Sequence, residues 1–368
     1  MSPIPFLDLQ FQHKQVQQAV SSAMSGVLER NRFILDQEVL AFEEEWAIYI
    51  GVPHCVGVGN GLDALTLSLM ACGIKPGDEV IVPAHTFFAT WLAVARCGAK
   101  PVAVDADPHT FNIDTERISE RTSPRTRIII PVHLYGQPCD MTRIMEIASK
   151  NQLLVVEDNA QAQGARWLQQ RTGGFGAANA TSFYPTKNLG ALGDGGAVTF
   201  LDPLMAEFVR RNRHYGMASK DVFVDRGVNS RLDEVQAAVL RIKLRRLDEW
   251  NGTRRMLADR YLTNLQGIGD LILPLSEKEA FHVYHLFVIR SRQRDRLKAW
   301  LEKSGISTMI HYPVPPHLQP AFSDLEYKGG EFPVAEDIAQ TALSLPLWPG
   351  MTDDQVDFVT ERIVAFFR

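Results

Sequence analysis

One lysine of this chain stands in a setting that suits covalent chemistry with an aldehyde. Lys187 closes a Ser-x-x-x-x-Lys frame that begins at Ser182, and a glycine-rich turn follows it directly. Upstream, the apolar run 153–156 predicts a buried parallel strand that delivers Asp158 at its carboxyl end, where open α/β sheets bind ligands. A lysine that can form a Schiff base, an acid that can pair with a pyridinium nitrogen and a serine near a phosphate are what pyridoxal phosphate requires. The sequence therefore predicts a pyridoxal phosphate site with Lys187 and Asp158 as its catalytic residues.

A second pattern suits the phosphate group. The segment 59–61 (Gly-Asn-Gly) predicts a tight turn between a strand at 55–58 and a helix that opens near Asp63. The amino terminus of a helix offers free backbone N–H groups and the positive end of the helix dipole. Gly61 and Leu62 are therefore candidate phosphate ligands through their main chain, and Ser182 would add a hydroxyl. A lone Gly-x-Gly is also common in plain turns, so the neighbouring motifs carry this prediction.

Apolar strand candidates alternate with helical patterns along most of the chain. This alternation predicts an α/β fold with a mostly parallel sheet and helices on both faces. We expect a large cofactor-binding domain over 1–245, which includes two amino-terminal helices, and a smaller α/β domain over 246–368. The apolar spacing over 232–257 predicts one long helix that connects the two domains.

Length and composition exclude several classes of protein. The chain has 368 residues, 45% hydrophobic content and a formal net charge of −5, with no run of lysine or arginine longer than two. It can bury a large core, and it has no electrostatic footprint for nucleic acid or an anionic membrane. The four cysteines have no metal-ligand spacing, so no metal site is expected. Because the sequence shows neither a leader pattern nor a membrane-length apolar stretch, we expect a cytoplasmic protein.

Four segments together resemble the DegT/DnrJ/StrS aminotransferases, which are sugar aminotransferases. The resemblance runs from 5–9 near the amino terminus to 311–313, and so covers nearly the whole chain. It implies the fold of the pyridoxal-phosphate-dependent transferases of fold type I and a homodimer with shared active sites. The segments are 57–65, 157–164, 183–196 and 229–238.

The resemblance also implies roles for individual cofactor residues. Asp158 would keep the pyridine nitrogen protonated, and Gln161 would lie near the ring hydroxyl. Phe87 would stack on the pyridine ring, although its neighbours are also aromatic and one of these rings could simply be core. Many family members have threonine where Leu62 stands, so a side-chain hydroxyl is absent at this position. Asn229 would reach the phosphate of the cofactor in the neighbouring subunit.

For the substrate, the resemblance places Tyr184 and His311 around a sugar. Lys220 and the arginines at 210–213 could meet a diphosphate, but a charged run is more often a solvated helix face. The implied reaction moves an amino group from L-glutamate to a keto group of a nucleotide-linked sugar by a ping-pong mechanism. The segment 89–94 together with 59–65 resembles the branch that acts at C-3 of dTDP-3-keto-6-deoxyhexoses, in deoxyamino sugar biosynthesis.

Several alternatives remain beside this interpretation. An aminotransferase of the same family could act on C-4 of a nucleotide keto-sugar or on a cyclitol ketone, and the cofactor motifs do not separate these substrates. Family dehydratases have histidine in place of the lysine, so Lys187 disfavours that reaction. A non-enzymatic regulator would need a helix-turn-helix with a basic face, and we find neither. A Rossmann oxidoreductase is disfavoured because no G-x-G-x-x-G follows a predicted strand.

Overall fold

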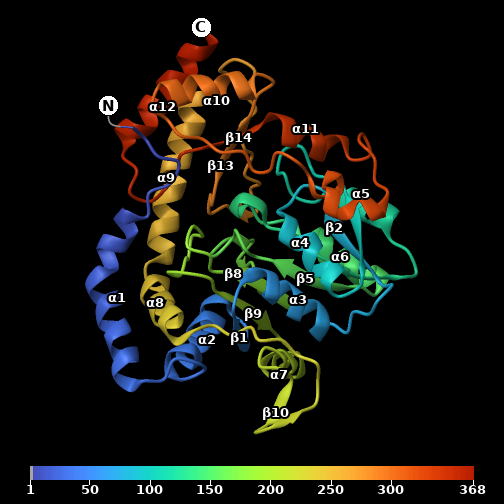
Figure 1. Ribbon diagram of the computed structural model, residues 1–368. Helices are drawn as coiled ribbons and strands as arrows, with labels where there is room; N and C mark the ends of the chain where they lie inside the picture. Colours follow the sequence, from blue (N-terminus) through green and yellow to red (C-terminus); the bar gives the residue numbers. More distant parts are fainter. Residues whose placement is uncertain (1–2) are drawn as a thin grey trace.

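A seven-stranded sheet forms the centre of the computed structural model, which describes residues 3–368 (Figure 1). The strand order is β1-β9-β8-β5-β4-β2-β3, and β9 is antiparallel to both its neighbours whereas the other pairs are parallel. Met1 and Ser2, which open the segment without a leader pattern, lie outside the described residues. The strands are β1 (His54–Val58), β2 (Glu79–Pro83), β3 (Lys100–Val104), β4 (Thr126–Ile129), β5 (Leu154–Asp158), β8 (Ala178–Ser182) and β9 (Gly196–Phe200).

Helices cover both faces of this sheet, as the sequence predicts. The helices of the first two thirds of the chain are α1 (Gln10–Arg30), α2 (Gln37–Ile50), α3 (Gly61–Ala71), α4 (Phe88–Arg96), α5 (Thr115–Ile118), α6 (Met141–Asn151), α7 (Pro203–Asn212), α8 (Glu234–Leu244) and α9 (Leu247–Leu265). Short strands flank the sheet: β6 (Arg166–Trp167), β7 (Gln170–Arg171), β10 (Met217–Ser219), β11 (Val222–Phe223) and β12 (Ala280–Phe281). Tight 3-10 turns lie at Ser119–Arg121, Leu134–Gly136, Pro316–Leu318 and Pro320–Leu325.

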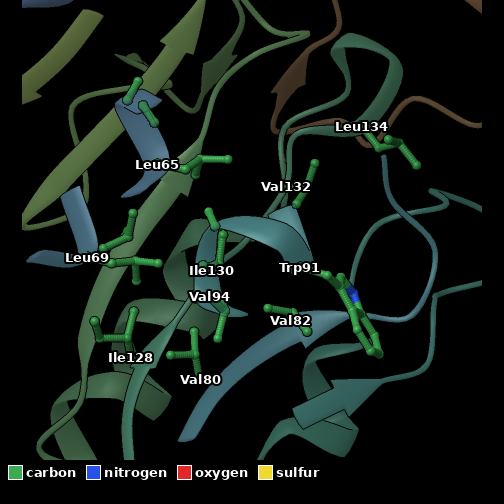
Figure 2. Packing of buried hydrophobic residues seen from close by; sticks show 14 of the residues in the cluster. Leu65, Leu69, Val80, Val82, Trp91, Val94, Ile128, Ile130, Val132 and Leu134 are labelled. Atoms are coloured by element: carbon green, nitrogen blue, oxygen red, sulfur yellow. The ribbon is translucent and has the colours of Figure 1, made fainter. Parts of the chain in front are cut away.

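Neighbouring residues of one strand enter different buried clusters, because alternate side chains of a strand point to opposite faces. Val80 and Val82 of β2 pack with side chains of α3 and α4, such as Leu65 and Trp91 (Figure 2). Ile81, between them, packs with side chains of α6. Both faces of β2 are therefore apolar and covered, which explains why the sequence of such strands reads as a continuous apolar run rather than an alternating one.

The carboxyl-terminal part adds a smaller layer of helices on a two-stranded antiparallel sheet. Its core joins side chains of α9, α10 and α12 with Ile4 from the amino-terminal segment, which pairs with Ile306. Figure 1 shows α9 running from the large sheet into this layer. The elements are β13 (Phe287–Arg290), α10 (Arg294–Lys303), α11 (Pro333–Thr341), β14 (Ala342–Leu345) and α12 (Asp353–Phe367).

The prediction of one continuous helix over 232–257 is wrong, because the chain forms two helices there. The helix α8 ends at Leu244, and α9 begins at Leu247. The Arg246 N–H bonds to the Lys243 carbonyl, a tight turn that interrupts the α-helical pattern. Apolar spacing continues on both sides of the turn, so periodicity alone could not reveal the break. The division into two domains near this point stays a prediction.

Within residues 3–368, no helix combines the length and apolar character that a membrane span requires.

A buried ion pair fixes α7 against β1. The Arg213 guanidinium, which follows α7, pairs with the Glu43 carboxylate and also donates to the Gly57 carbonyl at 2.7 Å. The same carboxylate accepts the Gly57 N–H at 2.8 Å. Glu43 and Arg213 thus hold both backbone groups of one residue in β1, two residues before the predicted phosphate turn.

We expect Arg213→Leu to lower the free energy of unfolding by about 3–5 kcal/mol, because it leaves the buried Glu43 charge without its partner. The matched control is Arg210→Leu on the same helix, where the pair with Glu207 is exposed and is worth about 0–1 kcal/mol. Urea unfolding of the two variants measures the difference. Equal losses would contradict the structural role of the buried pair.

Candidate active site

The carboxyl ends of β1, β2, β5 and β8 open on a cavity of about 510 Å³. Open α/β sheets bind their ligands at this edge, since strand ends and loops meet there. Two residues predicted for the site, Lys220 and Asn229, do not line this cavity. The predicted residues that do line it are Gly61, Leu62, Phe87, Asp158, Gln161, Ser182, Tyr184, Lys187 and His311.

Lys187 lies in the loop between β8 and β9. Its backbone N–H bonds to the Tyr184 carbonyl at 2.9 Å, and the loop closes where the Ala191 N–H meets the Phe183 carbonyl at 2.8 Å. A side chain at Gly190 would place Cβ 2.3 Å from the Pro185 carbonyl oxygen, so the turn behind the lysine requires glycine. Burial lowers the pKa of the Lys187 ammonium to about 8, against the opposing influence of the Asp158 charge. A larger fraction of this lysine is therefore a free amine near neutral pH than of an exposed lysine.

Asp158 ends β5 and faces the same cavity. Its carboxylate accepts hydrogen bonds from the Thr90 hydroxyl at 2.9 Å and from the Ala160 N–H at 3.2 Å. Burial raises the pKa of this carboxyl, whereas these two hydrogen bonds and the positive charges of Lys187 and His133 lower it. The site therefore surrounds a desolvated acid with groups that favour its ionised form.

The preceding residue, Glu157, has a different task. Its carboxylate contacts the His133 ring at 2.8 Å and accepts three backbone N–H groups of the turn 173–176. Every one of these partners lies away from the cavity, because adjacent strand residues point to opposite faces. Of the two consecutive acids, only Asp158 is therefore placed to meet a ligand.

The turn 59–61, called the phosphate turn below after its predicted role, joins β1 to α3 as the sequence predicts. Asn60 caps α3 by accepting the Asp63 N–H at 2.8 Å. Gly61 and Leu62, the first two helical residues, line the cavity, and the amides of a first helical turn have no partner within the helix. A Cβ at Gly61 would lie 2.6 Å from the Cβ of Ser182. The absence of a side chain at Gly61 thus lets the amino terminus of α3 approach the serine closely. Two amides, a hydroxyl and a positive dipole end form a cradle for an anionic group.

Aromatic and amide groups form the opposite wall. The Phe87 ring is 54% exposed, and its centroid lies 5.4 Å from that of Tyr312. Gln161 accepts the Tyr135 N–H at 2.7 Å and donates to the Tyr312 hydroxyl at 2.9 Å, which fixes the orientation of its amide. The stacking expected of Phe87 and the ring-hydroxyl contact expected of Gln161 stay predictions.

Two histidines border the lysine. Burial and the Lys187 charge lower the pKa of His311 to about 4, and its ring lies 2.8 Å from the Ser344 hydroxyl. Burial together with the charge of Lys187 also depresses the pKa of His285. Both imidazoles are therefore neutral at neutral pH. Tyr184 lies at the cavity mouth with 52% of its surface exposed.

Sequence reasoning missed His285, whose hydrogen-bonding polarity is fixed by its neighbours. Asn188 donates both amide protons, to the Asn251 side-chain oxygen at 2.8 Å and to the Val283 carbonyl at 3.2 Å. Its own oxygen, 3.1 Å from His285 Nδ1, must therefore accept, so Nδ1 carries the ring proton. A neutral ring then has an unprotonated Nε2. His285 thus brings a hydrogen-bond acceptor to the cavity wall beside Lys187.

The predicted diphosphate contacts are placed elsewhere. Lys220 occupies the turn between β10 and β11, a hairpin that projects from the body near α7 (Figure 1). The arginines at 210, 211 and 213 pair with Glu207, Asp225 and Glu43 respectively. Arg210 and Arg211 fit the expectation of a charged helix face, whereas Arg213 does not, because it is buried against Glu43.

Asn229 is exposed, does not line the cavity and is paired with His214 through the backbone. Its neighbour Ser230 bonds to the Gly59 N–H at 3.0 Å and to the Asp63 carboxylate at 2.8 Å. The segment that carries Asn229 is thus tied to the phosphate turn, while the Asn229 side chain stays available at the surface.

Comparison with known proteins identifies the family to which this chain belongs. The model of the DegT/DnrJ/EryC1/StrS aminotransferase family matches residues 14–364. The chain belongs to this family. A relative from Saccharopolyspora erythraea, named erythromycin biosynthesis sensory transduction protein EryC1, is 48% identical, with 98% of this chain and 99% of the relative covered. The dTDP-3-amino-3,4,6-trideoxy-alpha-D-glucose transaminase of Streptomyces venezuelae is 46% identical, with 98% and 95% covered.

A solved structure agrees with the whole fold. The crystal structure of S. venezuelae DesV in complex with a ketimine intermediate superposes with a TM-score of 0.98 at 44% identity, covering 100% of this chain and 99% of the other. The α/β fold of the type I pyridoxal-phosphate-dependent transferases, predicted from the sequence, is confirmed. So is the prediction that the chain is an aminotransferase.

The lowered pKa of Lys187 can be measured with a small aldehyde that reacts only with the free amine. In protein freed of ligands, we expect the reaction of Lys187 to rise with a midpoint near pH 8, below the value of about 10.4 for an exposed lysine. Because the Asp158 charge stabilises the ammonium and raises this pKa, Asp158→Asn should move the midpoint lower. Cyanoborohydride trapping and peptide mass spectrometry across pH give both midpoints. A higher midpoint in Asp158→Asn would contradict the electrostatic coupling.

Proposed function

We propose that this protein uses pyridoxal phosphate to move an amino group from L-glutamate to a keto carbon of a nucleotide-linked sugar, namely C-3 of a dTDP-3-keto-6-deoxyhexose. The single observation that carries the proposal is the arrangement of three groups around one cavity. Lys187 and Asp158 border it with opposite charges, and the cradle at Gly61 and Ser182 lies beside them.

The residues present fit this cofactor. The amides of Gly61 and Leu62 and the Ser182 hydroxyl would hold the phosphate, and Asp158 would hold the ring nitrogen. Phe87 would cover the ring, and the remaining amide proton of Gln161 would serve the ring hydroxyl. When bound, pyridoxal phosphate supplies an aldehyde carbon that takes up the amino group and a ring that accepts the electron pair of a broken C–H bond.

Lys187 would act as the base and the acid of the reaction. Once its amine is free, it can take the proton from the α carbon of the amino donor and later deliver one to the carbon of the keto-sugar. Its depressed pKa of about 8 suits both directions, because the free amine that takes a proton is far more populated near neutral pH than in an exposed lysine, while the ammonium that returns one still forms. Asp158, held by two hydrogen bonds, would pair its carboxylate with the ring nitrogen of the cofactor, so the charge is placed before the substrate enters.

The cavity wall favours a sugar that lacks some hydroxyl groups. Besides the polar groups named above, apolar side chains line it, and a hydroxyl against them would lose its hydrogen bonds to water without replacement. The name of the S. venezuelae relative states an amino group at C-3 of a dTDP-linked trideoxy sugar, which supports the same carbon here. The apolar residues are Leu62, Leu65, Phe88, Leu92, Leu134 and Leu286. C-4 of a nucleotide keto-sugar and a cyclitol ketone remain the alternative acceptors.

We further propose a homodimer in which each site is completed by the neighbouring subunit. Asn229 is exposed, lies outside its own cavity and belongs to a segment anchored beside the phosphate turn. Lys220, on the projecting hairpin, would meet the diphosphate of a substrate bound to the other subunit. Exposed apolar residues on the same hairpin and loop are Val222, Phe223, Val224 and Val228, and burial in a dimer would stabilise them.

One relative is named as a sensory transduction protein, and that name would favour the alternative of a non-enzymatic regulator. In this chain the aldehyde-reactive lysine and its acid partner are both present and face one cavity. A purely regulatory protein would have no need of a desolvated lysine at a ligand cavity. The aminotransferase reaction is therefore the better proposal. The cytoplasmic location stays a prediction.

Activity on a defined substrate tests the reaction. We expect purified protein with L-glutamate to aminate a dTDP-3-keto-6-deoxyhexose, with the nitrogen on C-3 by NMR, and borohydride reduction with peptide mapping to place the cofactor on Lys187. Lys187→Ala should abolish turnover because the proton carrier is lost, whereas Lys303→Ala, far along the chain on α10, should not. Amination of only 4-keto-sugars or cyclitol ketones in the same panel would select an alternative. A reduced adduct on another lysine would refute the mechanism.

Mixing two defective variants tests the shared site. Lys187→Ala and Asn229→Ala are each expected to have little activity. In a mixed dimer, one site contains both substitutions and the other contains neither, provided that Asn229 serves the neighbouring subunit. Random mixing should then restore about a quarter of wild-type activity. If Asn229 serves its own subunit, every site stays defective and no activity returns.

A further inference from the structure

Two threonine hydroxyls form a buried chain that ends on Asp158. Thr86 Oγ1 lies 3.0 Å from Thr90 Oγ1, and Thr90 Oγ1 lies 2.9 Å from the second oxygen of Asp158. Thr90 is fully buried, and Thr86 is 2% exposed. Thr86 lies in the bend two residues before α4 begins, and Thr90 lies in the first turn of α4, so the entry of the chain into this helix brings both hydroxyls together.

The direction of these hydrogen bonds follows from proton counting. An ionised carboxylate only accepts, so Thr90 donates its single hydroxyl proton to Asp158. The Thr90 oxygen is then left as an acceptor, and Thr86 must donate to it. Thr86 lines the cavity and, having used its proton, can offer only lone pairs to a ligand. The acid at one end therefore fixes the orientation of both hydroxyls.

We propose that Thr90 is a positioning residue for the cofactor acid: its hydroxyl holds Asp158 in its orientation and in its charged form, and Thr86 fixes the direction of that hydroxyl. This inference rests on the proposed function, because it concerns the acid that meets the cofactor ring. Other elements also act on Asp158. Lys187 from the β8–β9 loop and His133 after β4 favour its charge, and burial opposes it.

Thr90 differs from these charged neighbours in that its bond is directional. The Ala160 N–H holds the first carboxylate oxygen at 3.2 Å, and Thr90 holds the second. The two bonds together set the plane of the carboxylate. A hydrogen bond to a charged group is among the stronger ones in proteins, and losing it leaves the buried acid less ionised. The acid would then bind the charged ring more weakly.

Thr90→Val removes the hydroxyl and keeps the shape, and Thr90→Ser keeps the hydroxyl. The matched control is Thr199→Val on β9, another fully buried threonine, whose hydroxyl donates to the Gly173 carbonyl at 2.5 Å. Each holoenzyme is prepared with pyridoxal phosphate labelled with ¹⁵N at the ring nitrogen. Two quantities are measured: the dissociation constant of the cofactor, and the ¹⁵N shift that reports protonation of the ring.

We expect Thr90→Val to bind the cofactor about tenfold more weakly, with the ¹⁵N signal moved towards the deprotonated position. Thr90→Ser and Thr199→Val should match the wild type in both measurements. Thr86→Val should shift both in the same direction as Thr90→Val but less, because the bond from Thr90 to Asp158 remains. Should Thr90→Val fail to fold, Thr90→Ala takes its place with Thr90→Ser as the reference.

A Thr90→Val protein that equals Thr199→Val in both affinity and ¹⁵N shift would overturn the role of Thr90. In that case an intact cofactor adduct on Lys187 of the wild type would leave the proposed function standing. Wild-type protein that takes up no cofactor would instead overturn the proposed function and, with it, this inference.

Discussion

The charge relation between Lys187 and Asp158 is the constraint on which the rest of the site depends. Each group is desolvated, and burial disfavours the charged form of both. The two charges reduce this penalty for one another, because opposite charges interact more strongly away from water. Neither residue is held by the other alone, however. Hydrogen bonds fix Asp158 at the end of β5, and a tight turn fixes Lys187 in the loop after β8, so each borders the cavity from its own element.

The sheet topology is what brings both residues to this cavity. Because the strands on either side run in the same direction, the acid from β5 and the lysine that follows β8 emerge at one edge. The reversed strand β9 returns the chain after the lysine and brings its loop back against the sheet. The apolar run of β5 is the sequence signature of burial on both faces, and this strand was predicted from it. The strand β8, whose sequence is Ala-Asn-Ala-Thr-Ser, carries no such run and was not predicted.

Much of the site could likewise be predicted from the sequence, since its residues lie at strand ends or in turns with recognisable spacing. Lys187, Asp158 and Gly61 are of this kind. His285 could not be found, because its role depends on contacts with Asn188 and, through it, Asn251 in other parts of the chain. Contacts between residues that are distant in the sequence cannot be predicted from local sequence patterns. The threonines at 86 and 90 are an intermediate case, since their four-residue spacing is visible but the acid they meet is not.

The helix break between α8 and α9 shows the same limit at the level of elements. Apolar residues continue in helical spacing across it, and the interruption is a property of one backbone turn. Alternation along β5 implies that Glu157 and Asp158 cannot both meet a ligand, but only the contacts of the folded chain show that Asp158 is the one that does. Geometry that follows from the period of an element is therefore predictable, whereas geometry that arises between elements needs coordinates.

The close approach of Gly61 to Ser182 has a consequence for how this scaffold diversifies. The helix that would grip the anionic end of the cofactor touches the strand from which the reactive lysine loop departs, with no room for an added methyl group. A shift of the start of α3 would therefore displace the end of β8, and the reverse also holds. A different acceptor molecule is therefore more easily accommodated by substitutions in α4, where Phe88, Ala89 and Leu92 line the cavity away from this contact, than by substitutions at Gly61 or Ser182.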